Sequence, residues 1–265
     1  MNAQAECGAV KRKVLVIGIG PGHPDYVTMQ AVGAMNRADL FFIPQKGEEK
    51  EELARVRREI CERYIDRPYR EVAFAVPSRR SALGGDYRDT VADWHAAVEQ
   101  VYRRLLTEEL QPGQCGAFLV WGDPTLYDST IRILERLLAA GGLDFDYEVI
   151  AGISAPQALA ALHKVPMNNI GQSILYTTGR RLAEGFPEGA DSVVVMLDGE
   201  LTWKDIDGDL DVYWGAYVGL PDQRLVAGKL SEVAGEVERI RADVRGAKGW
   251  LMDTTLIKRP GDGTA

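Results

Sequence analysis

Residues 117–130, AFLVWGDPTLYDST, carry the strongest structural signal in this chain. The first four residues are apolar and predict a buried strand, and apolar residues at helical spacing follow at positions 131, 134 and 138. Gly122 allows a ligand to approach the main chain closely, and one of the polar residues at 128–130 is suited to cap the helix. The segment therefore predicts a strand, a binding loop and a helix, although a turn that only connects a strand to a helix would give the same pattern.

A second glycine-rich loop, GIGPGHPDYVT at residues 18–28, follows an apolar segment near the start of the chain. Its first two glycines match the dinucleotide-binding fingerprint GxGxxG, but His23 stands at the third glycine position. Pro21 removes a main-chain amide that would face a pyrophosphate, and no acidic residue ends the next predicted strand, residues 40–43, to hold a ribose. A nicotinamide-dependent oxidoreductase is therefore the weaker interpretation of this loop.

The composition sets broad limits on function. The chain has 265 residues, of which 46% are hydrophobic, and this is enough for a substantial core. A formal net charge of −8 argues against nonspecific binding to nucleic acid or to an anionic membrane. Cys7, Cys61 and Cys115 are far apart and form no paired motif, which favours a reducing compartment. Because no apolar run is long enough to cross a bilayer or to act as a signal core, we expect a soluble, cytoplasmic protein.

Predicted strands and helices alternate along the chain, which indicates an α/β fold. In the first half, strands are expected at residues 13–17, 40–43, 72–76 and 117–120, and helices at 48–64, 91–105 and 131–138. In the second half, strands are expected at 147–150, 173–177, 192–197, 212–218 and 251–257, and helices at 158–163 and 233–244. Gly141 and Gly142 end a helix, so we place the boundary between two α/β domains there, with residues 1–141 in one and 142–265 in the other.

Two further motifs lie in the second half of the chain. AGISAPQALAAL, residues 151–162, has Ser154 and Gln157 at the spacing of a capping box, and TTGRRL, residues 177–182, ends a predicted strand with two arginines. Together with the two glycine loops, and in this order, these motifs resemble the tetrapyrrole methylase family. The resemblance extends over residues 13–259, with Ala151 in place of the proline that is usual in the family.

The resemblance implies two α/β domains with S-adenosylmethionine bound in the cleft between them. Carried over by motif, the cofactor contacts in the first half are Pro21, Trp121, Gly122, Asp123 and Leu126. Those in the second half are Ser154, Ala155, Leu197, Val218 and Trp250. The start of the helix at Ser154 suits the methionine carboxylate, because main-chain amides point toward an anion there.

The resemblance also implies transfer of a methyl group to a ring carbon of a precorrin in cobalamin biosynthesis, by a homodimer. Four segments, AFLVWGDPTLYDST, VVMLDG, YWGAYVG and GWLMDTTL, are similar to the subgroup that methylates precorrin-5 at ring carbon 1 and releases its acetyl group as acetate. Methylation at another precorrin or uroporphyrinogen position is the alternative within this chemistry. A non-catalytic nucleotide-binding or tetrapyrrole-binding module is the alternative from another class.

Acetate loss needs water and an acid or base, for which the candidates are Asp128, Asp253, His23 and Tyr127; the sequence does not rank them. The substrate carries several carboxylates, so an acidic protein must concentrate positive charge at its site, and the candidates are Arg180, Arg181, Lys46 and Lys164. Arg57 and Arg58 are expected to face solvent, with substrate contact as the alternative. The three histidines have no ligand spacing, so we expect no metal.

Overall fold

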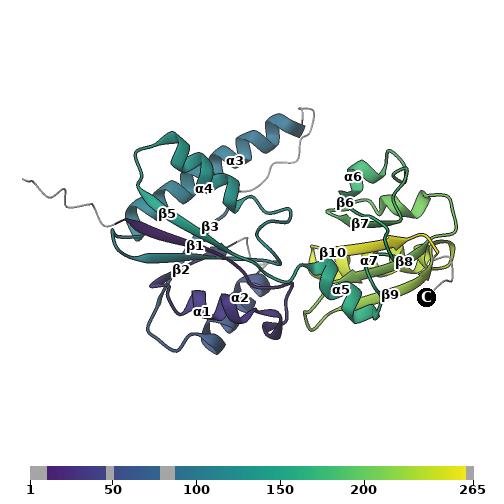
Figure 1. The fold of residues 1–265 in the computed structure, drawn as a ribbon, viewed down its shortest axis with the longest axis horizontal. Coiled ribbons are helices and arrows are strands. Elements are labelled where there is room, and N and C mark those ends of the chain that lie inside the picture. Colours follow the sequence, from purple (N-terminus) through teal and green to yellow (C-terminus); the bar gives the residue numbers. More distant parts are fainter. Residues whose placement is uncertain (1–10, 46–50, 78–86, 261–265) are drawn as a thin grey trace, which may run out of the picture. The chain divides into compact units, whose positions relative to one another are not determined.

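The computed structural model describes residues 11–45, 51–77 and 87–260 of the chain (Figure 1). These residues form two compact units, each built around a sheet of its own. The first unit contains residues 11–20 and 24–152, and the second contains residues 21–23 and 153–260. The α/β fold expected from the sequence is therefore confirmed.

The sheet of the first unit has five strands in the order β3-β2-β4-β1-β5. The strands are β1 (Arg12–Gly18), β2 (Leu40–Gln45), β3 (Arg70–Ala75), β4 (Cys115–Val120) and β5 (Phe145–Ile150). Every neighbouring pair in this sheet is parallel. Two of the three interior strands, β4 and β1, are nearly continuous apolar runs because helices cover both faces of a parallel sheet.

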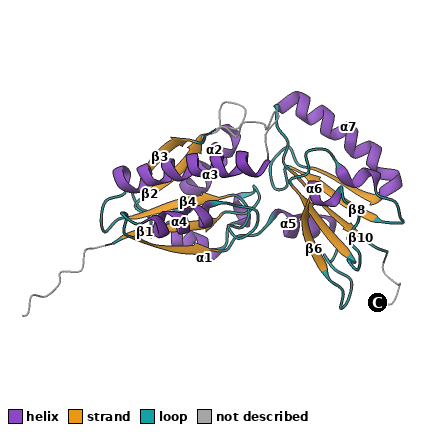
Figure 2. Cartoon of the chain, turned by 90° about the horizontal axis from the view of Figure 1, so that it is seen from above, coloured by secondary structure: helices purple, strands orange, loops and turns teal. Residues whose placement is uncertain are grey.

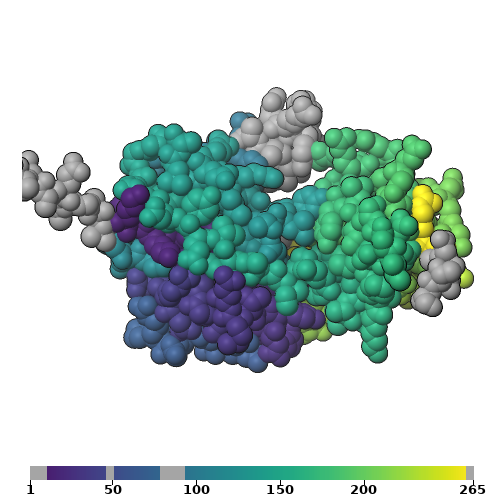
Figure 3. Space-filling model, in the orientation of Figure 1, coloured from purple at the N-terminus to yellow at the C-terminus, as the bar shows by residue number. Residues whose placement is uncertain are grey.

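The helices of the first unit form a layer on each face of this sheet (Figure 1). One layer contains α1 (Met29–Met35) and α2 (Glu51–Tyr64); the other contains α3 (Tyr87–Arg104), with its π-helical end Leu105–Glu109, and α4 (Thr130–Ala140). A short 3₁₀ helix, Pro24–Tyr26, precedes α1. Figure 3 shows the same layering from outside, with purple and blue residues on one side of the first unit and teal residues on the other.

Stacked aromatic side chains fill the core beneath α3 and α4. The ring of Phe118 on β4 lies 4.4 Å from that of Tyr102 on α3 and 4.6 Å from that of Phe42 on β2. Phe74 on β3 meets both Tyr102 and Phe118 edge-to-face. These rings extend to the carboxyl ends of the strands, where a parallel sheet offers its ligand site.

The predicted domain boundary needs correction. Gly141 does end α4, with a φ of 69°, but the strand that follows does not begin a new sheet. β5 pairs with β1 along its whole length, from Arg12 opposite Phe145 to Ile17 opposite Ile150, so the first unit continues to Gly152. The turn at Gly141 and Gly142 is an ordinary connection from a helix to an edge strand, and local turn signals do not distinguish such a connection from a domain boundary.

The sheet of the second unit also has five strands, in the order β6-β7-β10-β8-β9. The strands are β6 (Ile174–Thr178), β7 (Ser192–Met196), β8 (Asp211–Ala216), β9 (Arg224–Lys229) and β10 (Asp253–Lys258). Only β6 and β7 are parallel among the strand pairs of this described unit. Its helices are α5 (Ala155–His163), α6 (Gly179–Leu182), the 3₁₀ turn Thr202–Asp205 and α7 (Leu230–Lys248) (Figure 2).

The structure contains three short elements that the sequence pattern did not predict: α1, α6 and β9. Helices α1 and α6 are seven and four residues long, too short for two helical turns of apolar spacing. Edge strand β9 is mostly exposed and therefore lacks a clear apolar face. No helix in the described part of the chain is both long and apolar enough to cross a lipid bilayer.

Candidate functional site

Three glycines close the carboxyl edge of the first sheet. Gly18 ends β1, Gly122 follows β4, and Gly152 follows β5. A Cβ atom on Gly18 would lie 2.6 Å from the main-chain nitrogen of Gly152, and a Cβ on Gly152 would lie 2.1 Å from the carbonyl oxygen of Gly122. Since a side chain at either position would overlap main-chain atoms, the loops pack backbone against backbone here.

The two glycine loops found in the sequence are hydrogen-bonded to each other. The amide of Gly122 donates to the carbonyl of Gly20 over 2.8 Å, and the amide of Gly20 donates back over 3.3 Å. Both residues have positive φ angles, 79° at Gly20 and 69° at Gly122, which glycine adopts at low cost. Segments about a hundred residues apart in sequence therefore share one edge of the first unit.

The Asp123 side chain connects the loops at this edge by hydrogen bonds. Its Oδ2 accepts a hydrogen bond from the Gly152 amide over 2.8 Å, and its Oδ1 accepts one from the Thr125 amide, also over 2.8 Å. The first bond joins the loop after β4 to the loop after β5, and the second tightens the turn itself. Sequence reasoning assigned Asp123 only to ligand contact and missed this structural role.

Non-glycine residues with left-handed backbone lie in three of the segments assigned to the cofactor. Tyr127 in the loop after β4 has a φ of 54°, Leu197 after β7 has 54°, and Tyr217 after β8 has 49°. This conformation costs a non-glycine residue about 1–2 kcal/mol. Leu197 also holds its apolar side chain 67% exposed. Strained backbone with exposed apolar surface is typical of segments kept for binding, and not for the core.

Ser154 begins α5, as the capping-box spacing predicted. Its amide donates to Oε1 of Gln157 over 2.9 Å, and its hydroxyl donates to the same oxygen over 3.0 Å. The helix runs from Ala155 to His163 and packs on β8 and β10. The start of a packed helix is thereby fixed beside Ala155, the next residue of the predicted cofactor set.

Trp250 lies in a packed position within the second unit. Its carbonyl accepts a hydrogen bond of 2.6 Å from the Tyr217 hydroxyl, and the Tyr217 ring meets its indole edge-to-face at 4.8 Å. Trp250 is buried, as are two further members of the predicted set, Pro21 and Val218. The indole is therefore used mainly in packing, and the exposed apolar surface among the second-unit candidates comes from Leu197.

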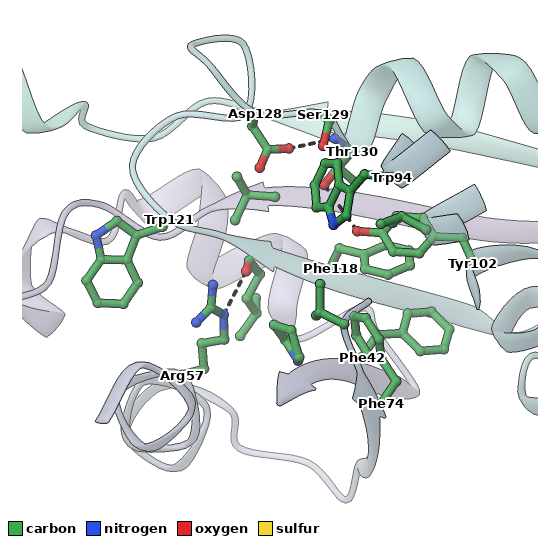
Figure 4. A pocket seen from close by; sticks show the side chains of 15 residues that line it. Phe42, Arg57, Phe74, Trp94, Tyr102, Phe118, Trp121, Asp128, Ser129 and Thr130 are labelled. Atoms are coloured by element: carbon green, nitrogen blue, oxygen red, sulfur yellow. Dashed lines mark hydrogen bonds between the residues drawn. The ribbon is translucent and has the colours of Figure 1, made fainter. Parts of the chain in front are cut away.

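A cavity of about 160 Å³ lies within the first unit at the carboxyl end of β4 (Figure 4). Six of the fifteen residues that line it are aromatic: Phe42, Phe74, Trp94, Tyr102, Phe118 and Trp121. Among the polar residues that line it are Arg57 from α2 and Asp128 from the loop before α4. A cavity that combines aromatic side chains with a few fixed polar groups is the usual form of a small-molecule site.

Comparison with known proteins identifies the family. Residues 13–234 match the model of the tetrapyrrole (corrin/porphyrin) methylases, which spans both units of the fold. This chain belongs to the tetrapyrrole methylase family. The resemblance carried by the four motifs is confirmed, and the protein is a methyltransferase.

Three similar proteins cover nearly the whole methylase. Precorrin-6A synthase [deacetylating] of Sinorhizobium sp is 49% identical over 260 residues, which are 97% of this chain and 98% of the relative. The crystal structure of a cobalamin-synthesis-related protein (CobF) from Corynebacterium diphtheriae superposes with a TM-score of 0.79 and 34% identity, covering 94% of this chain and 98% of that one. A uroporphyrin-III C-methyltransferase of Thermus thermophilus, solved with S-adenosylhomocysteine, shares the fold at a TM-score of 0.55 and 16% identity, with 93% of this chain and 97% of that one covered.

The four acid–base candidates of the methylase fall into different surroundings. Asp128 lines the aromatic cavity, and its Oδ1 accepts a hydrogen bond of 2.7 Å from the Thr130 amide at the start of α4. Tyr127 precedes it and is 43% exposed. His23 is exposed and belongs to the second unit. Tyr127 and Asp128 therefore lie in the loop before α4 in the first unit, whereas Asp253 belongs to the second unit.

Asp253 belongs to a buried polar cluster inside the second unit. Its Oδ2 accepts a hydrogen bond of 2.9 Å from Nε1 of Trp214 and lies 3.5 Å from Nε of Arg241. Burial raises the pKa of this carboxyl, although the positive charge of Arg241 opposes the shift. The partners and the burial of Asp253 are those of a structural residue.

The basic candidates are exposed where the structure describes them. Arg180 and Arg181 lie on α6, and Nη1 of Arg181 is 3.2 Å from a carboxylate oxygen of Glu184 in an exposed ion pair. Lys164 ends α5 with a φ of 58°. Lys46 lies outside the described residues. Within the described ranges, no group of three or more His, Cys, Asp or Glu side chains is arranged to hold a metal ion.

The cavity residue whose burial sequence reasoning missed is Arg57. It is only 8% exposed, whereas we expected it to face solvent. The helical spacing of the apolar residues did indicate this burial. Arg57 follows Leu53 by four residues and precedes Ile60 by three, so it lies on the apolar face of α2. A charged residue within an apolar stripe is an informative exception, because burying it needs specific partners.

Proposed function

We propose that this methylase converts precorrin-5 to precorrin-6A, placing a methyl group from S-adenosylmethionine on ring carbon 1 while the acetyl group on that carbon leaves as acetate. The observation that carries the proposal is the 49% identity to the Sinorhizobium enzyme over 97% of this chain. The 34% identity to the CobF structure supports the same assignment. Methylation of another ring position without acetate release is the competing activity.

The cofactor site in this proposal uses the residues assigned from the motifs. In the first unit these are Trp121, Gly122, Asp123 and Leu126; in the second they are Pro21, Ser154, Ala155, Leu197, Val218 and Trp250. The glycine-closed edge and the strained, exposed Leu197 support this assignment. When bound, S-adenosylmethionine supplies an electrophilic methyl group, and the protein then has to align the ring carbon with that methyl and exclude bulk water.

A single substitution tests the cofactor assignment. Gly122→Val places a branched side chain at a φ of 69° between two hydrogen-bonded loops, so we expect calorimetric binding of S-adenosylhomocysteine to disappear. Gly235→Ala is a matched control, because a Cβ there meets nothing within 4 Å, and it should bind as the parent does. Undiminished binding by folded Gly122→Val would remove this loop from the site.

Substrate carboxylates are held in this proposal by Arg180, Arg181, Lys164 and Lys46, the cationic candidates from the sequence. Arg180, Arg181 and Lys164 are exposed, which supports this assignment. We also propose a cytoplasmic location, which the free thiols of Cys61 and Cys115 support.

We further propose that the methylase is a homodimer. Edge strand β6 exposes Leu175 and Tyr176, and Ile170 just before it is 86% exposed. Exposed apolar side chains beside an unpaired sheet edge favour association with a second copy. Sedimentation at micromolar concentration should give the dimer mass, and a monomer would contradict this proposal.

The activity itself is tested with precorrin-5, S-adenosylmethionine and enzyme, by mass spectrometry of the corrinoid and an enzymatic acetate assay. One methyl group gained for each acetate released is the expected result. Methyl transfer without acetate would assign the protein to another position in the same chemistry. Binding of both ligands without turnover would favour a non-catalytic module.

A further inference from the structure

The guanidinium of Arg57 is buried without a carboxylate partner. Nε donates to the carbonyl of Leu119 over 3.0 Å, and Nη1 donates to the carbonyl of Leu53 over 2.8 Å. Nη2 donates no hydrogen bond to a described residue, and it is not among the fully buried side-chain atoms that lack a partner, so this nitrogen faces open space. Burial lowers the pKa of Arg57 to about 10, so the group still carries its charge at neutral pH.

The two main-chain bonds fix the guanidinium at the wall of the aromatic cavity. One joins it to its own helix and the other to β4, and the ring of Trp121 lies 5.5 Å from Cζ. Figure 4 shows Arg57 and Trp121 on the same side of the cavity. A fixed cation with a free N–H at a cavity wall is placed to bind an anion or a polarised carbonyl oxygen.

Asp128 gives the same cavity a negative charge. Its Oδ1 is held by the Thr130 amide, which leaves Oδ2 without a hydrogen bond from a described residue. The negative charge of Asp128 raises the pKa of Arg57, against the larger effect of burial, but the two side chains form no direct ion pair. A cation and a carboxylate that share a cavity without neutralising each other leave room for a ligand between them.

The size of the cavity limits the ligand. An engineered apolar cavity of about 150 Å³ takes up benzene, so this cavity of about 160 Å³ accommodates a two-carbon acyl group with a water molecule but not a whole macrocycle. Beside the low-dielectric aromatic walls, the electric field of the two charged groups is stronger than it would be in bulk water.

We propose that this cavity receives the acetyl group of precorrin-5, that Nη2 of Arg57 binds the acyl oxygen, and that Asp128 accepts a proton from the water that attacks the acyl carbon. This inference rests on the proposed function and assigns residues to the release of acetate.

The step balances without an oxidant or reductant. The water oxygen bonds to the acyl carbon, Asp128 takes the proton, and the carbonyl electron pair moves to the acyl oxygen beside Arg57. The carbonyl then re-forms, the bond to ring carbon 1 breaks, and its electron pair stays on the ring. Ring carbon 1 attacks the sulfonium methyl, whose bonding pair remains on sulfur. One water and one methyl donor are consumed, and one acetate and two protons are released.

The first test uses Arg57→Ala, with Arg63→Ala as the matched control, because Arg63 lies on the same helix in an exposed ion pair with Asp25. We expect Arg57→Ala to lower kcat for acetate release by about 10²–10³, the usual effect of removing one donor to a developing oxyanion, while S-adenosylhomocysteine affinity stays at the parental value. Arg63→Ala should retain parental kcat.

Chemical rescue separates substrate binding from a merely structural role. Methylguanidinium fits the space left in Arg57→Ala and should restore acetate release in a saturable manner, with no effect on the parent enzyme. Folded Arg57→Ala that releases acetate at the parental rate would overturn the proposal, and so would a slow variant that methylguanidinium does not rescue. If the parent itself methylates precorrin-5 without releasing acetate, the proposed function fails instead.

Asp128→Asn tests the base. The amide oxygen still accepts the Thr130 hydrogen bond, so α4 keeps its start. We expect kcat to fall by about 10²–10⁴ and the acid limb of its pH profile to disappear. A parental profile in this variant would overturn the assignment of Asp128.

Discussion

The two units of this methylase each bury an arginine, and the two arginines differ in what they contact. Arg57 in the first unit bonds only main-chain carbonyls and lines a cavity. Arg241 in the second unit is 4% exposed, bonds the carbonyl of Asp198 over 2.5 Å, and lies 3.5 Å from the carboxylate of Asp253. A buried arginine with a carboxylate beside it completes a folded core, whereas one without a carboxylate at a cavity wall is available to a ligand.

The second unit uses its charges to hold loops. The carboxylate of Asp198 accepts from the amide of Thr202 over 2.8 Å, while its carbonyl takes the bond from Arg241. The motifs VVMLDG and GWLMDTTL, which contain Asp198 and Asp253, are therefore structural in large part. In the first unit, the comparable charged side chains lie at the carboxyl edge of the sheet, where a substrate can contact them.

The largest effect on stability is expected from Arg241→Met. This substitution leaves the Asp253 carboxylate buried without its cation, which should lower the free energy of unfolding by about 3–5 kcal/mol. Urea denaturation measures it, with the exposed Arg239→Met on the same helix as a control that should stay within about 0.5 kcal/mol of the parent. Equal midpoints for both variants would remove the distinction between the two arginines.

Arg57→Met should have a smaller effect on stability. The substitution removes two hydrogen bonds to carbonyl groups but leaves no buried carboxylate without its cation. We therefore expect the free energy of unfolding to fall by about 1–3 kcal/mol in the same urea experiment. The two variants should therefore rank in opposite order for stability and for activity. Arg241→Met should be the less stable variant, and Arg57→Met should be the less active one per folded molecule. A larger loss of stability in Arg57→Met would mean that Arg57 is chiefly structural.

The sequence predicted the features of this fold that depend on neighbouring residues, but not those that depend on contacts between residues far apart in the chain. Alternating apolar patterns identified the α/β class, and glycine loops identified the sheet edge, because both signals are local. The pairing of β5 with β1 could not be predicted, since it joins residues more than a hundred positions apart and the glycines at 141–142 look the same at either kind of boundary. For the candidate site, the sequence pointed to the two glycine loops that the structure joins by hydrogen bonds, but the burial of Arg57 could not be predicted because it depends on packing against β4.

Because β5 belongs to the first unit, a carboxylate on this strand should make the stability of that unit depend on pH in the acid range. Hydrogen bonds from Arg37 and then Lys13 lower the pKa of Glu148 on β5 to about 2. The folded pKa lies below the ordinary value, so the stabilisation is present above about pH 4.5 and is lost as the pH falls toward 2. The carboxylate is 35% exposed, so we expect no more than about 1 kcal/mol, measured as a shallower acid dependence of unfolding in Glu148→Gln. Identical acid profiles would contradict the assignment.

The smallest effect on stability is expected from Arg181→Ala. The ion pair with Glu184 is exposed on both sides and contributes about 0–1 kcal/mol to folding. If Arg181 leaves that pair to bind a substrate carboxylate, precorrin affinity should fall several-fold while S-adenosylhomocysteine affinity stays constant. Superimposable precorrin titrations of variant and parent would show that Arg181 is only a surface charge.

The central claim, deacetylating methyl transfer, is tested most directly by the stoichiometry of a single reaction. Purified enzyme is mixed with precorrin-5 and S-adenosylmethionine, and acetate, S-adenosylhomocysteine and the mass of the corrinoid are measured in the same samples over time. The account predicts equal amounts of acetate and S-adenosylhomocysteine at every time point, with one methyl gained and one acetyl lost per macrocycle. A methylated product that keeps its acetyl group, with no acetate in solution, would contradict it.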